Sequence, residues 1–266
     1  MKAYYSYFKS EIMVGLQYRA AAFAGLSTQF FWGIILSFIY SSFYQHTSLP
    51  DFSIQEVMCY VWLNQAFFSL IYPSIKDNQI MDQIKNGTVA YELCRPYDLY
   101  WWWYLRILSK RYSACILRCL PVLVFSFILP KGYSLSLPSS VESLILFIIT
   151  LFLGTIIVTG INMIIQSISF FTNEDKGIAS IFYTIMSLLS GVAVPLPFLP
   201  DIINVINYVL PFRLISDLSY RTYSGNMNIN SILISILMQI VWIIIIIIIG
   251  KMIMKKVLTK ASIQGG

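Results

Sequence analysis

The segment SILISILMQIVWIIIIIIIGKMIM, residues 231–254, decides the fold. Seven consecutive isoleucines, Ile243 to Ile249, lie inside it, and Lys251 near its end is its only charged residue. An α-helix needs about 20 mostly apolar residues to cross the hydrocarbon core of a bilayer. The segment therefore predicts a transmembrane helix, and the same signal recurs along the chain.

The composition of the whole chain agrees with a membrane protein. Of the 266 residues, 58% are hydrophobic and only 11% are charged, and the mean hydropathy is +0.72. Soluble proteins carry about 25% charged residues, so this chain has too few polar side chains to cover a water-facing exterior. No Gly/Ser-rich linker or charge block divides it. We therefore predict a single membrane domain over residues 1–266.

Six windows are long and apolar enough to span a bilayer, which predicts an all-α, polytopic fold. They cover residues 21–44, 57–75, 112–129, 144–171, 177–194 and 231–254. With the N-terminus in the cytoplasm, all of the 18 lysines and arginines except Lys131, Arg213 and Arg221 fall on the inner side. Because cytoplasmic loops retain basic residues, six spans with both termini in the cytoplasm are expected. The basic residues then form a rim at the membrane surface, and no nucleic-acid partner is predicted.

Two segments on the cytoplasmic side have helical patterns. Within residues 1–20, Tyr5, Phe8, Ile12 and Leu16 recur at helical spacing, which predicts an amphipathic helix lying in the inner interface. Residues 76–111 are too long for a plain connection and too polar to enter lipid. This second segment is either an interfacial reinforcement or a docking site for a cytoplasmic protein.

The order of caps and stops inside residues 76–111 predicts two helices. Asp77 is suited to cap a short helix that Asn86-Gly87 ends. Asp98 then caps a second helix, which continues into the third span. The aromatic residues from Tyr100 to Tyr104 are expected in the lipid headgroup layer.

Residues 195–230 are expected to form a structured hairpin on the outer side. Three prolines at its start, Pro195, Pro197 and Pro200, prevent a continuous helix there. The apolar stretch 202–210 that follows is too short to cross a bilayer and ends at Pro211. A re-entrant or interfacial helix before the last span is therefore predicted.

Polar residues inside two spans fall on single helix faces. Thr155, Thr159, Asn162 and Gln166 form one such stripe, and Ser180, Thr184 and Ser187 form another. Packing between helices is the simpler interpretation. A substrate path or the seam with a second chain is the alternative.

The residues that could drive transport or catalysis within the chain are missing. No Asp or Glu lies deep in any window, whereas proton- or sodium-coupled carriers commonly keep one there. One histidine, His46, and four scattered cysteines make neither a metal set nor a catalytic triad. The chain also has no phosphate-binding loop of the form G-x-x-x-x-G-K-[ST]. An energy source outside this chain is therefore expected.

Several short motifs in this arrangement resemble the permease subunits of type-2 ABC exporters, in the bacterial branch of small six-span permeases. They are Ile84 to Thr88, Glu92 to Pro96, Ser190 to Pro200, Leu210-Pro211-Phe212 and Gln264 to Gly266. The resemblance covers almost the whole chain and is one of pattern and topology. One departure is the absence of proline from Ile215 to Ser224, a region where relatives often carry one.

The resemblance implies a permease that is not itself an enzyme. It implies a separate ATP-binding cassette subunit, which would hold ATP and Mg, and a second permease chain, identical or related. No cofactor is expected in this chain, and membrane lipids surround it. The residues expected to couple to the ATPase are Asp77, Gln79, Asp82, Lys85, Glu92, Arg95, Glu174 and Asp175.

The same resemblance implies export from the cytoplasm or inner leaflet across a bacterial inner membrane. The expected substrate is amphipathic or hydrophobic: a lipid, a peptide antibiotic or a drug. Two alternatives from other classes stay open at this point. One is an ion-coupled secondary transporter, and the other is an intramembrane enzyme of lipid metabolism.

Overall fold

The computed structural model describes residues 2–46, 52–73, 77–172 and 177–260. The regular elements in these ranges are helices, which confirms the all-α fold class. Four of them are long and apolar enough to cross a membrane. They are α2 (Arg19–His46), α7 (Leu99–Ile128), α8 (Val141–Thr172) and α12 (Ile229–Lys260).

The other two predicted spans contain shorter helices. In the second, α3 (Ile54–Ala66) is followed by its C-cap residue Phe67, and α4 (Phe68–Ile71) adds one turn. In the fifth, α9 (Gly177–Leu189) stops where Gly191 takes a φ of 86°, a left-handed conformation that suits glycine. Neither helix has the length of a full crossing by itself. The count of six spans therefore stays a prediction.

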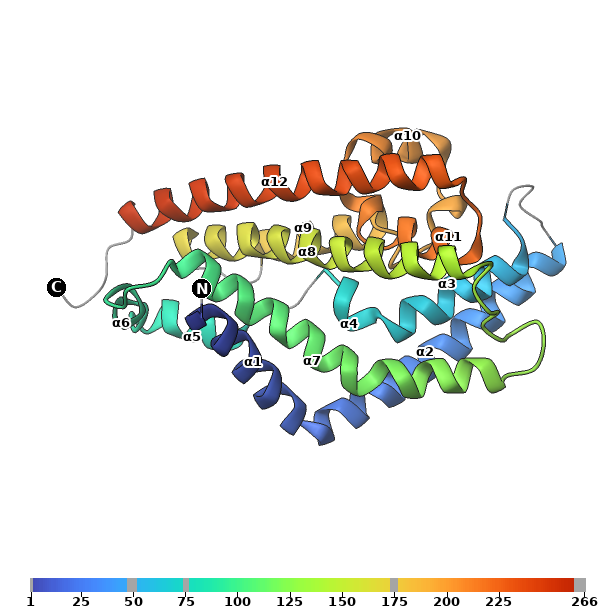
Figure 1. Cartoon of the computed structure of the whole chain (residues 1–266), viewed down its shortest axis with the longest axis horizontal. Helices are drawn as coiled ribbons and strands as arrows, with labels where there is room; N and C mark the ends of the chain where they lie inside the picture. Colours follow the sequence, from blue (N-terminus) through green and yellow to red (C-terminus); the bar gives the residue numbers. More distant parts are fainter. Residues whose placement is uncertain (1, 47–51, 74–76, 173–176, 261–266) are drawn as a thin grey trace.

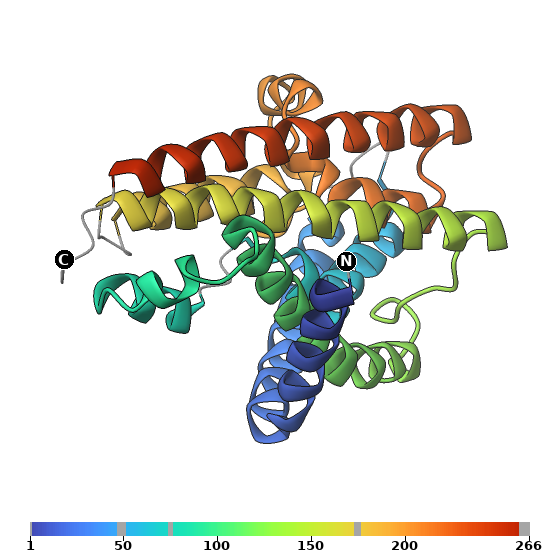
Figure 2. The same ribbon diagram turned by 60° about the vertical axis from the view of Figure 1, so that its left-hand side comes forward.

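Helices α8 and α12 run side by side, as Figures 1 and 2 both show. Helix α11 (Asp217–Ser224) packs against α8 and α3 at the end of the bundle away from α5 (Asn78–Lys85). Glycines let these elements approach closely. A methyl group on Gly160 would lie 2.6 Å from the Ile246 side chain, and one on Gly250 would lie 2.7 Å from the Tyr100 hydroxyl. Small residues at helix contacts are the usual packing device inside membranes.

Helix α1 (Lys2–Gln17) packs along the first half of α7, and α2 continues along the second half. The ring of Tyr7 stacks on Trp102 at 3.6 Å between centroids. Farther along, Gly15 faces Ser113 and Gly25 faces Arg118. The predicted amphipathic segment is thus helical from Lys2 through Gln17. Phe8 packs against Tyr112 of α7, whereas Tyr5 is 70% exposed. The depth of this helix in the membrane interface stays a prediction.

Polar side chains donate hydrogen bonds to the backbone carbonyl groups that lie where the helices are interrupted. Asn207 in α10 (Asp201–Val209) donates to the Leu189 carbonyl, Ser216 to that of Ser190, and Asn64 to that of Val192. Backbone groups without partners are costly where water is scarce. The interruption after α9 is therefore stabilised by side chains from three other segments.

Gln239 donates hydrogen bonds in the same way where the chain is interrupted before α11. Its Nε2 donates to the carbonyls of Leu214 and Thr150, at 2.8 and 2.9 Å, and so joins α12, η2 (Phe212–Leu214) and α8. Replacing Gln239 with Leu should lower stability by about 1–3 kcal/mol, because the Leu214 carbonyl loses this buried donor. The midpoint of thermal unfolding in detergent measures the effect. Gln45→Leu, at an exposed position, should change it little; equal shifts would contradict the capping role.

Candidate functional site

The segment between α4 and α7 folds as two short helices at one end of the molecule (Figure 1). Helix α5 is followed by Gly87, whose φ of 69° is the predicted left-handed stop. Helix α6 (Val89–Leu93) comes next, and α7 begins directly after Asp98. The predicted short helix, its stop and the continuous second helix are confirmed.

Asp77 fixes α5 through both of its carboxylate oxygens. Oδ1 accepts hydrogen bonds from the backbone N–H groups of Gln79 and Ile80, at 3.0 and 3.3 Å. Oδ2 lies 2.7 Å from Arg106 Nε and 2.7 Å from Lys110 Nζ, both on α7. The side chain is fully buried. One carboxylate therefore caps α5 and also ties it to α7.

The charge of Asp77 is maintained by its two cationic partners. Burial by itself would raise the pKa of this carboxyl, but the Arg106 guanidinium and the Lys110 ammonium outweigh burial and lower the pKa below its usual range. The group is consequently ionised at neutral pH. Its stabilising effect is present above the pKa of the unfolded chain and is lost only as the pH falls through the lower folded value.

Arg106 extends this connection to the N-terminal helix. Its guanidinium lies 3.7 Å from the Glu11 carboxylate and donates to the Tyr7 hydroxyl, both on α1. It also donates to the side-chain oxygen of Gln79 on α5. Helices α1, α5 and α7 are thereby joined around one guanidinium.

The remaining predicted coupling residues occupy varied positions. Gln79, Asp82 and Arg95 are exposed, and Glu92 is half-buried and accepts a hydrogen bond from the Tyr97 hydroxyl. The side chain of Lys85 and both Glu174 and Asp175 lie outside the described residues. Contact between any of these residues and an ATPase stays a prediction.

The start of α7 is fixed in the same way as the start of α5. Asp98 Oδ1 accepts from the backbone N–H groups of Tyr100 and Trp101, at 3.0 and 3.4 Å, as the predicted cap requires. Its Oδ2 lies 3.0 Å from Lys251 Nζ, which adds a link to α12. Both sides of this ion pair are partly exposed, so it contributes little to stability by itself.

The expectation that Tyr100 to Tyr104 lie in the headgroup layer is wrong for three of the five. Tyr100, Trp103 and Tyr104 are buried inside the protein, in a cluster with Ile80 of α5, Met163 of α8 and Met254 of α12. Only Trp101 and Trp102 are partly exposed. The reason is that α5, α8 and α12 surround this part of α7. The three buried aromatic residues therefore pack in one cluster with Ile80 of α5.

The two polar stripes differ in exposure. The stripe of α8 is buried within the chain, as packing between helices requires, and Thr155 and Thr159 donate to carbonyls one turn earlier. The stripe of α9 faces outward at Ser180 and Thr184. Ser187 is half-buried and lines a cavity of about 500 Å³. Whether either stripe forms a path or a seam stays a prediction.

That cavity, which we call the lateral cavity, lies between α2, α3, α4, α7 and the end of α9. Gln29, Trp32, Asn64, Phe68, Arg118 and Ser187 are among its lining residues. The amide of Gln29 is buried, with no hydrogen-bond partner in the described ranges. Apolar rings beside a few polar groups suit an amphipathic ligand.

Three cations of α7 also shape this site, although the sequence indicates for them only a place on the inner side of the membrane. Arg106 and Lys110 hold Asp77, and Arg111 donates from Nη1 to the carbonyls of Ser69, Leu70 and Tyr72 at the end of α4. The spacing of Arg106 and Lys110, one helical turn apart, was the signal that could have suggested a shared anionic partner.

The model of the family described as ABC-2 family transporter protein matches residues 5–265. No curated protein matches the chain.

Proposed function

Since the chain belongs to the ABC-2 family of transporter proteins and is a multi-pass membrane permease, we propose that it is an ATP-driven exporter. The exported compound is amphipathic or hydrophobic, and a separate subunit hydrolyses the ATP. That subunit holds ATP and Mg on the cytoplasmic side. It docks on α5 and the adjoining turns, with Asp82 and Arg95 as exposed contacts. The export direction and the bacterial inner membrane follow from the resemblance of the motifs.

The observation that carries this proposal is the attachment of α5 to α7 and α1 through Asp77 and Arg106. If α5 transmits force from the partner subunit to α7, it must stay firmly attached to α7. The buried Asp77 carboxylate caps α5 and pairs with two cations of α7, Arg106 and Lys110, at 2.7 Å each. ATP-driven closure of the partner subunit would therefore tilt α7 and α1 together.

The proposed route for the substrate uses the lateral cavity and the outward face of α9. A second permease chain, identical or related, packs against Ser180 and Thr184, and the lateral cavity of each chain opens toward that seam. Gln29 and Arg118 supply polar contacts beside apolar rings. This chemistry fits a lipid, a peptide antibiotic or a cationic drug with an apolar body.

Purification of the tagged chain from the cells that make it tests the proposal. The expected result is a complex that retains a polypeptide with a G-x-x-x-x-G-K-[ST] loop and hydrolyses ATP. Reconstituted vesicles should then transport an amphipathic dye only when ATP is present. Transport driven by an ion gradient without any ATP-binding subunit would refute the proposal.

Replacing Asp82 and Arg95 together with Ala should weaken retention of the ATP-binding subunit at least tenfold without lowering the thermal stability of the chain. Both side chains are exposed, so their loss removes contacts to a partner and no internal packing. Binding of the purified ATP-binding subunit to the purified permease measures the effect. Replacing Glu142 and Lys131 with Ala removes the same two charges at exposed positions elsewhere and serves as the control. Unchanged retention in the first variant would exclude this docking surface.

A further inference from the structure

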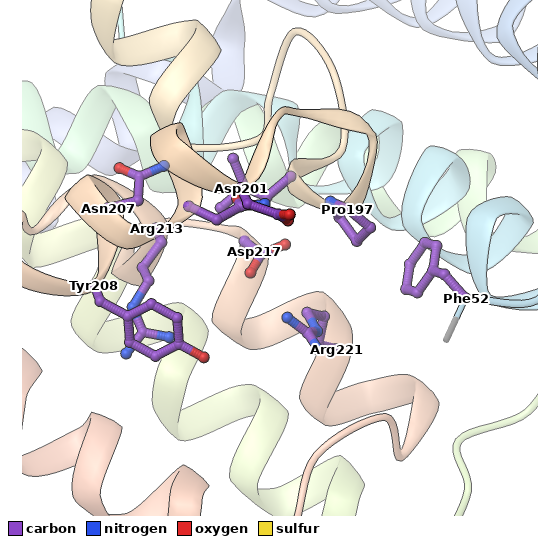
Figure 3. Close-up of a pocket in the computed structure, with 10 residues that line it drawn as sticks. Phe52, Pro197, Asp201, Asn207, Tyr208, Arg213, Asp217 and Arg221 are labelled. Atoms are coloured by element: carbon purple, nitrogen blue, oxygen red, sulfur yellow. The ribbon is translucent and has the colours of Figure 1, made fainter. Parts of the chain in front are cut away.

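A second cavity, of about 400 Å³, lies at the end of the bundle away from α5. We call it the hairpin cavity, because α10, η2 and α11 of the segment 195–230 form most of its wall. The transport proposal does not use it. Figure 3 shows charged side chains of both signs around it, and these are Asp201, Arg213, Asp217 and Arg221.

Arg213 is the most unusual of these residues. It is only 8% exposed, and its guanidinium carbon lies 4.2 Å from the centre of the Tyr208 ring. Its Nε has no hydrogen-bond partner within the described ranges, and none of the ion pairs found there includes it. Stacking on a ring compensates only part of the cost of burying a charge. An anionic group in the cavity would supply the missing acceptor.

Arg221 provides a second donor to the same cavity. Its Nη2 donates to Asn226 at 2.9 Å, while its Nε is buried without a partner among the residues described. Two guanidinium groups on one cavity are a common way to bind phosphate, because each presents several N–H donors in a plane.

The wall also presents acceptors that need donors. Asn207 is fully buried and donates to the Leu189 carbonyl, but its Oδ1 has no partner in the part of the chain described. Asp217 is 3% exposed and accepts one hydrogen bond from the Tyr60 hydroxyl, at 3.3 Å. Asp201 adds an exposed carboxylate to the same wall. A ligand for this cavity must therefore bring donors as well as an anion.

The charge balance points the same way. Burial raises the pKa of Asp217 to about 6, although Arg221, Arg213 and the Tyr60 hydroxyl lower it. The two carboxylates of the wall, Asp201 and Asp217, equal the two guanidinium groups in number. A purely anionic ligand would meet both carboxylates, whereas a zwitterion satisfies both signs.

The surroundings of the cavity suit a ligand with an apolar tail. Helix α10 exposes a row of aliphatic side chains on its outer face, and these are Ile202, Val205, Ile206 and Val209. A soluble surface rarely exposes so many together, whereas a lipid-facing helix does. A headgroup in the cavity would place its acyl chains beside α10.

We propose that the hairpin cavity binds the phosphoethanolamine headgroup of a phospholipid. The phosphate lies against Arg213 and Arg221, and the ammonium donates to Asp201, Asp217 or Asn207 Oδ1. A primary ammonium is required because a trimethylated one has no N–H to donate. This site goes beyond the transport function and does not involve the ATP-binding subunit, so either proposal can fail without the other.

Lipid binding to the purified permease in detergent tests this site directly. Short-chain phosphatidylethanolamine, phosphatidylglycerol and phosphatidylcholine are titrated separately, and bound lipid is counted by native mass spectrometry. The expected result is at least tenfold tighter binding of phosphatidylethanolamine. Arg213→Gln should remove that preference, and Arg213→Lys should retain part of it. Lys131→Gln removes an exposed cation outside the cavity and should leave the preference unchanged.

Several outcomes would overturn the proposal. Equal binding of the three lipids, or an unchanged preference in Arg213→Gln, would exclude the cavity as a headgroup site. Free phosphoethanolamine that binds as tightly as the lipid would assign the cavity to a soluble zwitterion instead. Should Arg213→Gln fail to fold, Asp201→Asn at an exposed position gives the test: it should lower the preference for phosphatidylethanolamine over phosphatidylglycerol, and no change would count against the site.

Discussion

Asp77→Asn is expected to abolish ATP-driven transport while leaving the ATP-binding subunit itself active. The substitution keeps the shape of the side chain and an oxygen that can still cap α5. It removes the charge that pairs with Arg106 and Lys110 across 2.7 Å contacts. Two cations on α7 are then left without their buried anion.

The expected cost is on the order of 3 kcal/mol, at the lower end of the range for a broken buried ion pair, because Lys110 is partly exposed to water. Such a change shifts the balance between attached and detached α5 by about a hundredfold. Asp77→Ala should cost about 1 kcal/mol more, because it also removes the cap. Transport of a dye into proteoliposomes and ATP turnover of the complex are the two measurements.

Glu142→Gln is the matched control, because it neutralises an exposed carboxylate far from α5 in sequence. It should leave transport and ATP turnover unchanged. Asp77→Asn should also lower the thermal stability of the permease, whereas the double variant of Asp82 and Arg95 should not. Normal transport in Asp77→Asn would show that the attachment of α5 to α7 is dispensable.

Gly154→Ala is expected to destabilise the permease by about 3 kcal/mol, the upper end of the range for overpacking. A methyl group at Gly154 would lie 2.3 Å from the Ile215 carbonyl oxygen and 3.0 Å from that of Leu214. Both obstacles are backbone atoms, so no side-chain rotation relieves the clash. The segment leading into α11 must move away from α8, and the hydrogen bond from Gln239 to Leu214 is lost with it.

Gly177→Ala provides the comparison for Gly154→Ala. No described atom lies within 4 Å of the position that its methyl group would occupy. Alanine is also the better helix former, so this variant should be as stable as the parent or slightly more so. The thermal midpoint in detergent and the yield of monodisperse protein measure both variants. Equal stability of the two would contradict the close contact between α8 and the hairpin.

Local sequence predicts the features of this fold that depend only on residues within one helical turn of each other. The caps Asp77 and Asp98 and the stop at Gly87 were all predicted, because each contact joins residues two or three positions apart. The pairing of Asp77 with Arg106 spans 29 positions. It depends on how α5 lies on α7, which no local pattern specifies.

The polar residues inside the spans show the same limit. Asn64 and Gln239 lie inside two of the predicted spans, and both donate to carbonyls at helix interruptions. Their spacing within a helix shows which face they occupy but cannot show which backbone groups lie opposite. The aromatic run starting at Tyr100 was misplaced for a related reason, since the same composition suits both a membrane interface and a buried helix contact.

Photo-crosslinking from α5 tests directly whether the ATP-binding subunit docks on this helix. A benzoylphenylalanine residue is placed at position 82, on the exposed face of α5, and another at position 137, an exposed site at the other end of the molecule. After illumination of the native membrane, a crosslink to the ATP-binding subunit is expected from position 82 and none from position 137. Crosslinks from both positions, or from neither, would contradict the claim that α5 receives the force of ATP hydrolysis.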